Sequence, residues 1–202
     1  MSTPKGYVTR LLALDCETTG LHFNQDNPAL GDGKHGYFQT VSWGLIVVNA
    51  VTFETIEELY LEIQWDGNSV WNTKAESVHG LSKAYLKENG VSRSEAVESI
   101  GNLIINHWGV DSPVHVLGHN PQFDLAFLKA DLRSEGLEIK FGSKMIDTNS
   151  IGFAVYGTHN SDDLFDMVGL PKRDDHNALV DARNALQVVQ TTRLISNDCF
   201  GL

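Results

Sequence analysis

The stretch LLALDCETTGL, Leu11–Leu21, decides how the rest of the chain is interpreted. An apolar run that ends in turn residues predicts a buried strand, here from Tyr7 to Asp15. Residues two apart in a strand point to the same face of the sheet. We therefore expect Asp15 and Glu17 to project together, and Cys16 to point the other way, into the core.

Two carboxylates side by side at a strand end suggest a bound cation. Like charges repel, and a cation between them relieves the repulsion. Hard divalent ions with oxygen ligands, Mg²⁺ above all, suit such a pair. The plain alternative is two solvated acids followed by a TTG turn, and so short a motif does not decide between them.

The bulk composition predicts one domain over residues 1–202, with the termini 1–6 and 196–202 loosely placed. The 202 residues are 42% hydrophobic, enough for an ordinary core. The net charge of −11 argues against a broad basic face for nucleic acid, although bound cations can supply positive charge locally. Two cysteines, no signal-peptide pattern and no membrane-length apolar run lead us to expect a cytoplasmic protein without a membrane partner.

The order of predicted elements indicates an α/β fold with a mixed five-stranded sheet flanked by helices. A second and third strand lie close enough to form a hairpin, and later strands alternate with helices. The predicted strands after the first are 39–49, 54–64, 114–120 and 144–148, and the helices begin at Ser92, Pro121, Ser161 and Asn177. Ser92 with Glu95 forms a capping-box pattern, and Ser161 is the expected cap of its helix. The segment 24–38 is rich in glycine, asparagine and aspartate, which predicts a long surface loop.

A second acidic segment is NPQFDLAF, in which Asp124 falls in the first turn of a helix that follows a strand. A helix N-terminus favours a negative charge by roughly 0.3–1 kcal/mol, so simple helix stabilisation is the alternative to a site. Asp131 lies further along the same helix, and we expect it on the solvated face.

A third segment is HNALVDA, His176–Ala182. His176 precedes the last helix, and Asp181 lies just over one turn inside it. Ala178 and Ala182 are small and four apart, so a neighbouring element could pack closely on that side. Taken alone, His176 could equally be a capping or surface histidine, and Asp181 an ordinary first-turn acid.

Together and in order, these segments resemble the DEDDh exonucleases of the DnaQ-like family. That family carries Asp-x-Glu-Thr after its first strand, an aspartate after an HN…FD segment, and a late His-x-Ala-x-x-Asp motif. A fourth likeness is His79-Gly80, with Leu81 in place of the family's usual isoleucine. Asn177 occupies the position where the sister class has a tyrosine. The three motifs are matched by Asp15, Glu17 and Thr18; by His119, Asn120, Phe123 and Asp124; and by His176, Ala178 and Asp181.

The resemblance implies a ribonuclease-H-like fold and a metal-dependent 3′–5′ exonuclease. Such an enzyme hydrolyses single-stranded DNA or RNA from the 3′ end to nucleoside 5′-monophosphates, with proofreading beside a DNA polymerase as a candidate role. Two divalent ions, Mg²⁺ or Mn²⁺, would be held by Asp15, Glu17, Asp124 and Asp181, with His176 as the general base. The implied substrate contacts are Thr18, Leu21, His79 and Phe123.

Two other functions stay open at this point. One is oligoribonuclease-like trimming of very short RNA, which the low positive charge would suit. The other is a non-catalytic module that binds a polymerase or a nucleic-acid end. Phe123 has core packing as its alternative role. Lys172 and Arg173 are either phosphate contacts or solvated cations.

Overall fold

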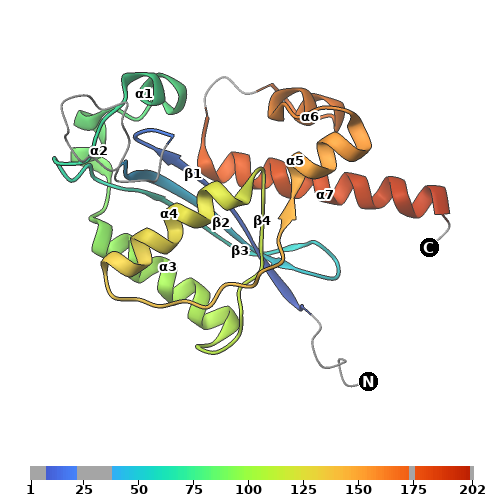
Figure 1. Ribbon diagram of the computed structural model, residues 1–202, viewed down its shortest axis with the longest axis horizontal. Coiled ribbons are helices and arrows are strands. Elements are labelled where there is room, and N and C mark those ends of the chain that lie inside the picture. Colours follow the sequence, from blue (N-terminus) through green and yellow to red (C-terminus); the bar gives the residue numbers. More distant parts are fainter. Residues whose placement is uncertain (1–7, 22–37, 173–175, 201–202) are drawn as a thin grey trace.

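The strand β1 (Arg10–Thr18) lies at the centre of the sheet in a computed structural model of the chain (Figure 1). The structure describes residues 8–21, 38–172 and 176–200. Within them the sheet has five strands in the order β3-β2-β1-β4-β5. β1 pairs antiparallel with β2 and parallel with β4, so the sheet is mixed as expected.

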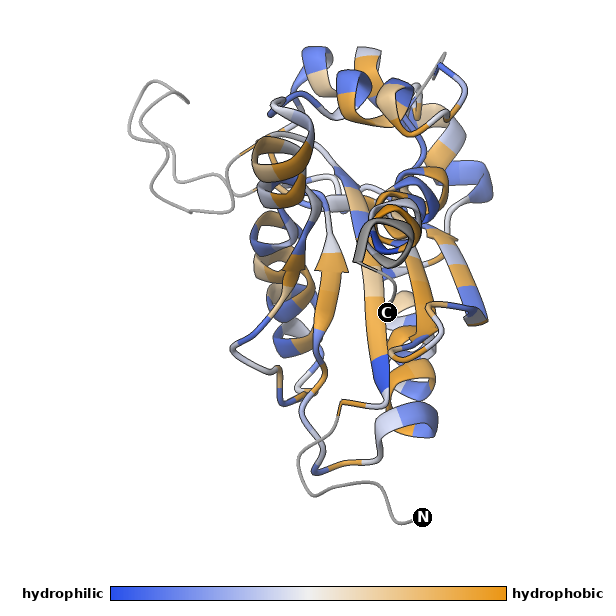
Figure 2. Ribbon diagram, turned by 90° about the vertical axis from the view of Figure 1, so that its right-hand side faces the viewer, coloured by the Kyte–Doolittle hydropathy of each residue, from blue (hydrophilic) through white to orange (hydrophobic). Residues whose placement is uncertain are grey.

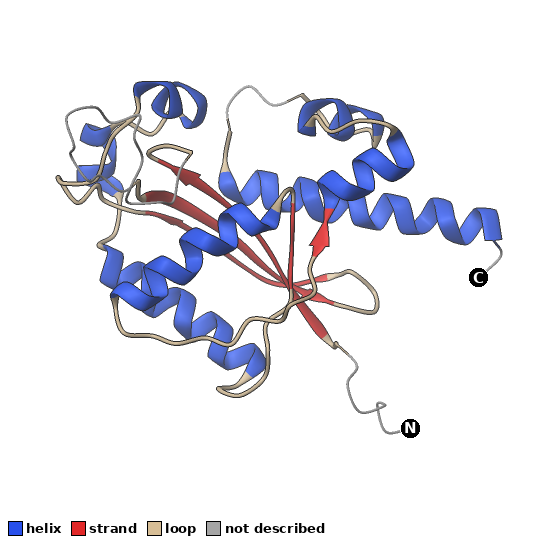
Figure 3. Cartoon of the chain, viewed as in Figure 1, coloured by secondary structure: helices blue, strands red, loops and turns tan. Residues whose placement is uncertain are grey.

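The remaining elements follow the predicted alternation of strands and helices (Figure 3). In chain order they are β2 (Thr40–Asn49), β3 (Thr55–Glu62), α1 (Thr73–His79), α2 (Lys83–Asn89), α3 (Arg93–Trp108), β4 (Val116–Gly118), α4 (Pro121–Ser134), β5 (Ile146–Asp147), α5 (Thr148–Ile151), the π-helix η2 (Gly152–Tyr156), α6 (Ser161–Met167) and α7 (Ala178–Phe200).

The two faces of the sheet carry separate cores, because alternate residues of β1 point in opposite directions. Leu12, Leu14 and Cys16 pack with α3 and α4 on one face. Leu11 and Ala13 pack with α7 on the other face. Apolar strands therefore lie between helical layers, as the hydropathy colouring shows (Figure 2).

Two glycines let helices approach β1 at the end where its acids lie. A Cβ on Gly44 of β2 would come within 2.2–2.3 Å of backbone atoms of Ala178 and Leu179, so only glycine admits the start of α7 there. A Cβ on Gly118 of β4 would lie 2.8 Å from the carbonyl oxygen of Leu14 and 3.1 Å from the Cβ of Pro121, the first residue of α4. Gly44 therefore admits the start of α7, and Gly118 lets β4 and the first turn of α4 lie close to β1.

Most predicted elements are confirmed, including the Ser92–Glu95 capping box of α3. The predicted cap of α6 is wrong: Asn160, not Ser161, accepts hydrogen bonds from the backbone of Asp162 and Asp163. α7 continues past Ile195 to Phe200. The helices α1, α2 and α5 and the π-helix were not predicted. The 24–38 loop and Arg173 fall outside the described residues, apart from Phe38.

Among the described residues, no helix combines the length and apolar character needed to cross a bilayer.

Candidate active site

The end of β1 presents its acids on the side of the sheet that α7 covers. Because Leu11 and Ala13 face α7, Asp15 and Glu17 share that face, and Cys16 points into the opposite core as predicted. The pairing with β2 shifts register between Glu17 and Thr18. Such irregularities often re-aim side chains next to active sites.

Asp124 reaches the same strand end from α4. Its side chain is 3% exposed, and its Oδ1 accepts a hydrogen bond of 2.9 Å from the backbone N–H of Cys16. Burial raises the pKa of Asp124 to about 7, and the nearby charge of Glu17 adds to the rise, although the hydrogen bonds from Cys16 oppose it. This carboxyl therefore sits where its negative charge is unfavourable unless a cation joins it.

His176 and Asp181 complete the group from the start of α7. One potential ligand atom each from Glu17, His176 and Asp181 lie within 4.8 Å of one another. The Nδ1 of His176 lies 3.4 Å from Oδ2 of Asp181. Glu17 and Asp181 are only 9% and 5% exposed, whereas the side chain of His176 is 39% exposed. Two nearly buried carboxylates beside a solvent-facing imidazole can hold a cation and accept a proton from water.

Asn177 fixes the geometry of this helix start, a role that the sequence did not reveal. Its side-chain oxygen accepts hydrogen bonds of 3.1 Å from the backbone of Leu179 and Val180, and its carbonyl oxygen accepts one of 2.8 Å from Asp181. An asparagine followed by a helical pattern is a general N-cap signal that could have indicated it.

His79 lies beside the group at the end of α1. The backbone N–H of His176 donates a 3.3 Å hydrogen bond to the carbonyl of Val78. The Nδ1 of His79 accepts from the backbone N–H of Leu81 at 3.0 Å, so the proton of the neutral ring is on Nε2. Burial lowers the pKa of His79 and so favours this neutral ring, an effect opposed by Glu76 and reinforced by His176. Its buried Nε2 has no hydrogen-bond partner among the described residues.

The other predicted substrate contacts differ in how far they are exposed to solvent. The Thr18 hydroxyl is buried and donates to the carbonyl of Gly20 at 2.7 Å. Leu21 is 75% exposed. Phe123 packs against the core and lies 5.1 Å from Phe127 between ring centroids, in agreement with the alternative role in packing. Lys172 is exposed.

The second motif contains structural residues as well. Asn120 adopts a left-handed backbone conformation with φ of 58°, which asparagine tolerates better than most residues. Its N–H donates to Oδ1 of Asp147, which also caps α5. The Nδ1 of His119 pairs with the hydroxyl of Thr148 at 3.1 Å. These contacts fix the turn from β4 into α4, and so the position of Asp124.

The expectation that Asp131 lies on the solvated face is wrong. Its side chain is 6% exposed, and its Oδ2 accepts a 3.1 Å hydrogen bond from the indole N–H of Trp43. Arg93 lies 3.9 Å from the other oxygen. Asp131 therefore ties α4 to β2. The buried Cys16 has a thiol pKa raised by burial and by Asp124 and other nearby acids, so it remains a protonated thiol rather than a nucleophile.

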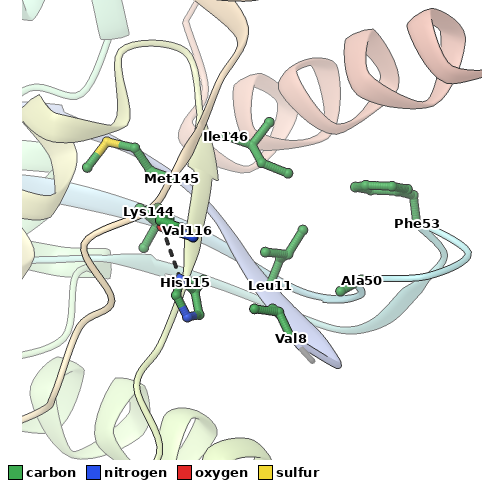
Figure 4. A pocket seen from close by; sticks show the side chains of 9 residues that line it. All are labelled: Val8, Leu11, Ala50, Phe53, His115, Val116, Lys144, Met145 and Ile146. Atoms are coloured by element: carbon green, nitrogen blue, oxygen red, sulfur yellow. Dashed lines mark hydrogen bonds between the residues drawn. The ribbon is translucent and has the colours of Figure 1, made fainter. Parts of the chain in front are cut away.

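An apolar cavity of about 380 Å³ lies at the other end of β1, near Val8 and Leu11 (Figure 4). Phe53 and Ile146 line its walls, and its polar lining side chains are His115 and Lys144. Because the described residues that line it include no carboxylate, it lacks the chemistry that gathers at the opposite end of the strand.

Solved structures that are similar to this chain include those of E. coli exonuclease I. A zinc-bound complex of that protein with single-stranded DNA has a TM-score of 0.73 at 15% identity, over 96% of this chain and 42% of that one. A complex of E. coli exonuclease I with a dA16 oligonucleotide has a TM-score of 0.71 at 15% identity, over 93% of this chain and 41% of that one. A structure of apo exonuclease I has a TM-score of 0.70 at 15% identity, over 92% of this chain and 42% of that one.

This chain thus spans less than half the length of these neighbours. No protein-family model matches it. No curated protein sequence matches it either. At this identity the likeness establishes the fold, so the chain shares the α/β fold of part of E. coli exonuclease I.

Proposed function

We propose that this chain is a metal-dependent 3′–5′ exonuclease of the DEDDh class, acting on single-stranded nucleic acid. The observation that carries the proposal is the meeting of Glu17, His176 and Asp181, whose potential ligand atoms lie within 4.8 Å of one another at the end of β1. The three motifs that resemble the DnaQ-like family lie far apart in the sequence. Convergence of two of them, with Asp124 from the third hydrogen-bonded to the same strand, supports a common site.

The donor set fits divalent cations. Glu17, Asp124 and Asp181 are nearly buried carboxylates, and their charges lie close enough that Glu17 raises the pKa of Asp124. Asp15, two residues before Glu17 on the same face, would be the fourth ligand. Bound Mg²⁺ or Mn²⁺ would neutralise these charges, activate water and stabilise the leaving oxygen. The acidic net charge is then no obstacle to a phosphate substrate.

The chain's own residues would perform the proton transfer and the positioning. His176 would take a proton from the attacking water through Nε2, because its Nδ1 faces Asp181. Asp181 would orient that ring and stabilise its protonated form. The exposed Leu21 and the Nε2–H of His79, which has no acceptor in the described part of the chain, would contact the terminal nucleotide.

The fold neighbours support single-stranded DNA as the first substrate to test, because two of those solved structures hold it. RNA stays a second candidate, since discrimination depends on contacts to the 2′ position. Proofreading beside a polymerase stays a prediction.

The test is a degradation assay with 5′-labelled and 3′-labelled single-stranded DNA and RNA, with Mg²⁺ or Mn²⁺ and with a chelator. We expect stepwise loss from the 3′ end that requires metal, and its abolition in Asp15→Ala and His176→Ala with unchanged thermal unfolding. Full activity in Asp15→Ala would remove the site assignment. Binding of oligonucleotides without any cleavage would favour a non-catalytic module.

A further inference from the structure

Two tryptophans on the segment that joins β3 to α1, and a lysine at the first position of α2, lie next to the candidate active site. Trp65 and Trp71 are both partly buried, and their ring centroids are 6.0 Å apart. Trp71 in turn lies 6.3 Å from the ring of His79. The rings thus form a row that begins at the candidate site and leads away from it.

The segment is fixed to the end of β1 rather than loosely attached. The N–H of Asn72 donates a 2.8 Å hydrogen bond to the carbonyl of Thr19, directly after the Asp-x-Glu-Thr motif. The amide oxygen of Gln39 accepts from the hydroxyl of Ser69 and from the backbone N–H of Asp66, both at 2.9 Å. α1 and α2 stand at this end of the sheet (Figure 1).

Both indole rings are held by their polar edges, and both tryptophans are only partly buried. The N–H of Trp65 donates to the carbonyl of Ser69 at 3.0 Å, and the N–H of Trp71 donates to the carboxylate of Glu76 at 2.6 Å. Rigid aromatic rings lose little entropy when a planar partner stacks on them. Nucleobases are such partners, whatever their sequence.

Lys83 supplies the charge that a nucleic acid strand requires. Its Nζ lies 3.7 Å from the ring centroid of Trp65 and 5.2 Å from that of Trp71. Within the described part of the chain, Lys83 forms no ion pair. A lysine has a long flexible stem, so the ammonium can leave the ring for a phosphate oxygen while remaining near it.

The buried Nε2–H of His79, which lacks an acceptor among the described residues, connects this row to the candidate site. An orphaned buried donor is costly, and a sugar or phosphate oxygen would satisfy it. The chain carries a net charge of −11, and Lys83 places one cation beside the two rings.

We propose that Trp71, Trp65 and Lys83 bind the nucleotides that lie 5′ of the terminal one, with bases against the indole rings and a phosphate at Lys83. The proposal rests on the proposed exonuclease function and extends it to a strand of several nucleotides.

The test compares the p-nitrophenyl ester of thymidine 5′-monophosphate, a substrate of one nucleotide with no 5′ neighbour, with an octanucleotide, as oligo(dT) and oligo(U), for the full chain and its variants. Base stacking on one aromatic ring changes affinity by about tenfold, so Trp71→Leu should raise KM for the octamer about tenfold and leave KM for the one-nucleotide ester unchanged. Trp71→Phe should restore most of the loss, and Lys83→Gln should weaken the octamer only.

Trp108→Leu is the matched control, because Trp108 is also partly buried but lies at the far end of α3. Its neighbour His107 accepts a hydrogen bond from Arg10, at the opposite end of β1 from the acids. Equal effects of Trp71→Leu on both substrate lengths, or no effect on either, would overturn the proposal.

Binding of fluorescein-labelled octamer, followed by anisotropy with a chelator present, separates this proposal from the proposed function. If the wild type cleaves nothing but binds the octamer about tenfold more tightly than Trp71→Leu does, the exonuclease assignment fails and the binding row stands. If the wild type cleaves the octamer with metal but binds it no more tightly than Trp71→Leu does, the exonuclease assignment stands and the binding row fails. Thermal unfolding of every variant shows which of them remain folded. If Trp71→Leu does not fold, the milder variants Trp71→Phe and Lys83→Gln are compared with the wild type instead.

Discussion

The first and third turns of α4 each bury one aspartate, and the two have different surroundings. Asp124 and Asp131 are seven residues apart, so they lie on nearly the same side of the helix. They are 3% and 6% exposed, and burial raises the pKa of both. Residue type, helix and burial are therefore the same for the two.

The difference lies in the partners. Asp131 accepts the indole N–H of Trp43 and lies 3.9 Å from Arg93, so a neutral donor and a cation compensate its carboxylate. Asp124 accepts the N–H of Cys16 and has Glu17 nearby, so its compensation is incomplete. A buried acid that the protein itself satisfies is structural, whereas one left beside other acids is a candidate ligand for a cation.

The largest expected effect is on catalysis, and the two aspartates provide matched variants. Asp124→Asn should lower metal-dependent hydrolysis by at least about 10³-fold, because loss of a carboxylate ligand removes several kcal/mol of charge stabilisation. Asp131→Asn makes the same chemical change two turns later and should keep activity within about threefold of the wild type. Steady-state rates with Mg²⁺ measure both. Equal losses in the two variants would break the comparison.

The next effect is on stability as a function of pH. The unfolded chain ionises Asp124 near its ordinary pKa of 3.8, whereas the folded chain keeps the proton until about 7. The native state therefore binds more protons between these values, and stability without metal falls as pH rises from about 4 to about 7. The shift of about three units corresponds to about 4 kcal/mol at most.

Urea unfolding with a chelator at pH 5 and pH 8 measures this effect. Asp124→Asn should be more stable than the wild type at pH 8, and the difference should shrink at pH 5. Mg²⁺ should stabilise the wild type most at pH 8 and should stabilise the variant less, because the variant keeps only three of the four carboxylates. The decisive quantity is the difference in unfolding free energy between the wild type and Asp124→Asn. If that difference is the same at pH 5 and pH 8, the charge of Asp124 is not destabilised in the fold.

The sequence singled out Asp124 as a candidate ligand and wrongly placed Asp131 on the solvated face, and the reason is physical. Asp124 follows a strand-to-helix pattern, and its motif occurs in order with two others, so local signals and motif order both point to it. The burial of Asp131 depends on Trp43, which lies 88 residues earlier in the chain. No local pattern encodes such a contact, and an acid on a helix is solvated more often than not.

The same limit applies to the fold. The strands, α3, α4 and α7 have clear apolar patterns, capping residues or both, and they were predicted. α1 and α2 are seven-residue helices rich in polar residues, with one buried residue each, His79 and Leu86. Such short helices depend on contacts with the rest of the protein rather than on periodicity. The rings of Trp65 and Trp71 went unrecognised as a pair for that reason.

A smaller effect concerns the structural aspartate itself. Asp131→Ala should lower the free energy of unfolding by about 1–3 kcal/mol, because it leaves the buried N–H of Trp43 without an acceptor. Asp131→Asn keeps an acceptor oxygen and should recover most of that loss. Urea unfolding monitored by circular dichroism measures both. An alanine variant as stable as the wild type would mean that the hydrogen bond between Asp131 and Trp43 contributes little to the free energy of unfolding.

The smallest effect separates the two partners of Asp131. Arg93 is partly exposed, with nitrogens 3.9 Å from Asp131 and 3.6 Å from Asp66, so Arg93→Met should cost at most about 1 kcal/mol, less at high salt. A double-mutant cycle of Arg93→Met with Asp131→Asn should give a coupling energy below about 1 kcal/mol. That result would assign the stability of Asp131 to the Trp43 hydrogen bond. A coupling energy above about 2 kcal/mol would instead make Asp131 a buried ion pair, and its contrast with Asp124 would then rest on one nearby cation.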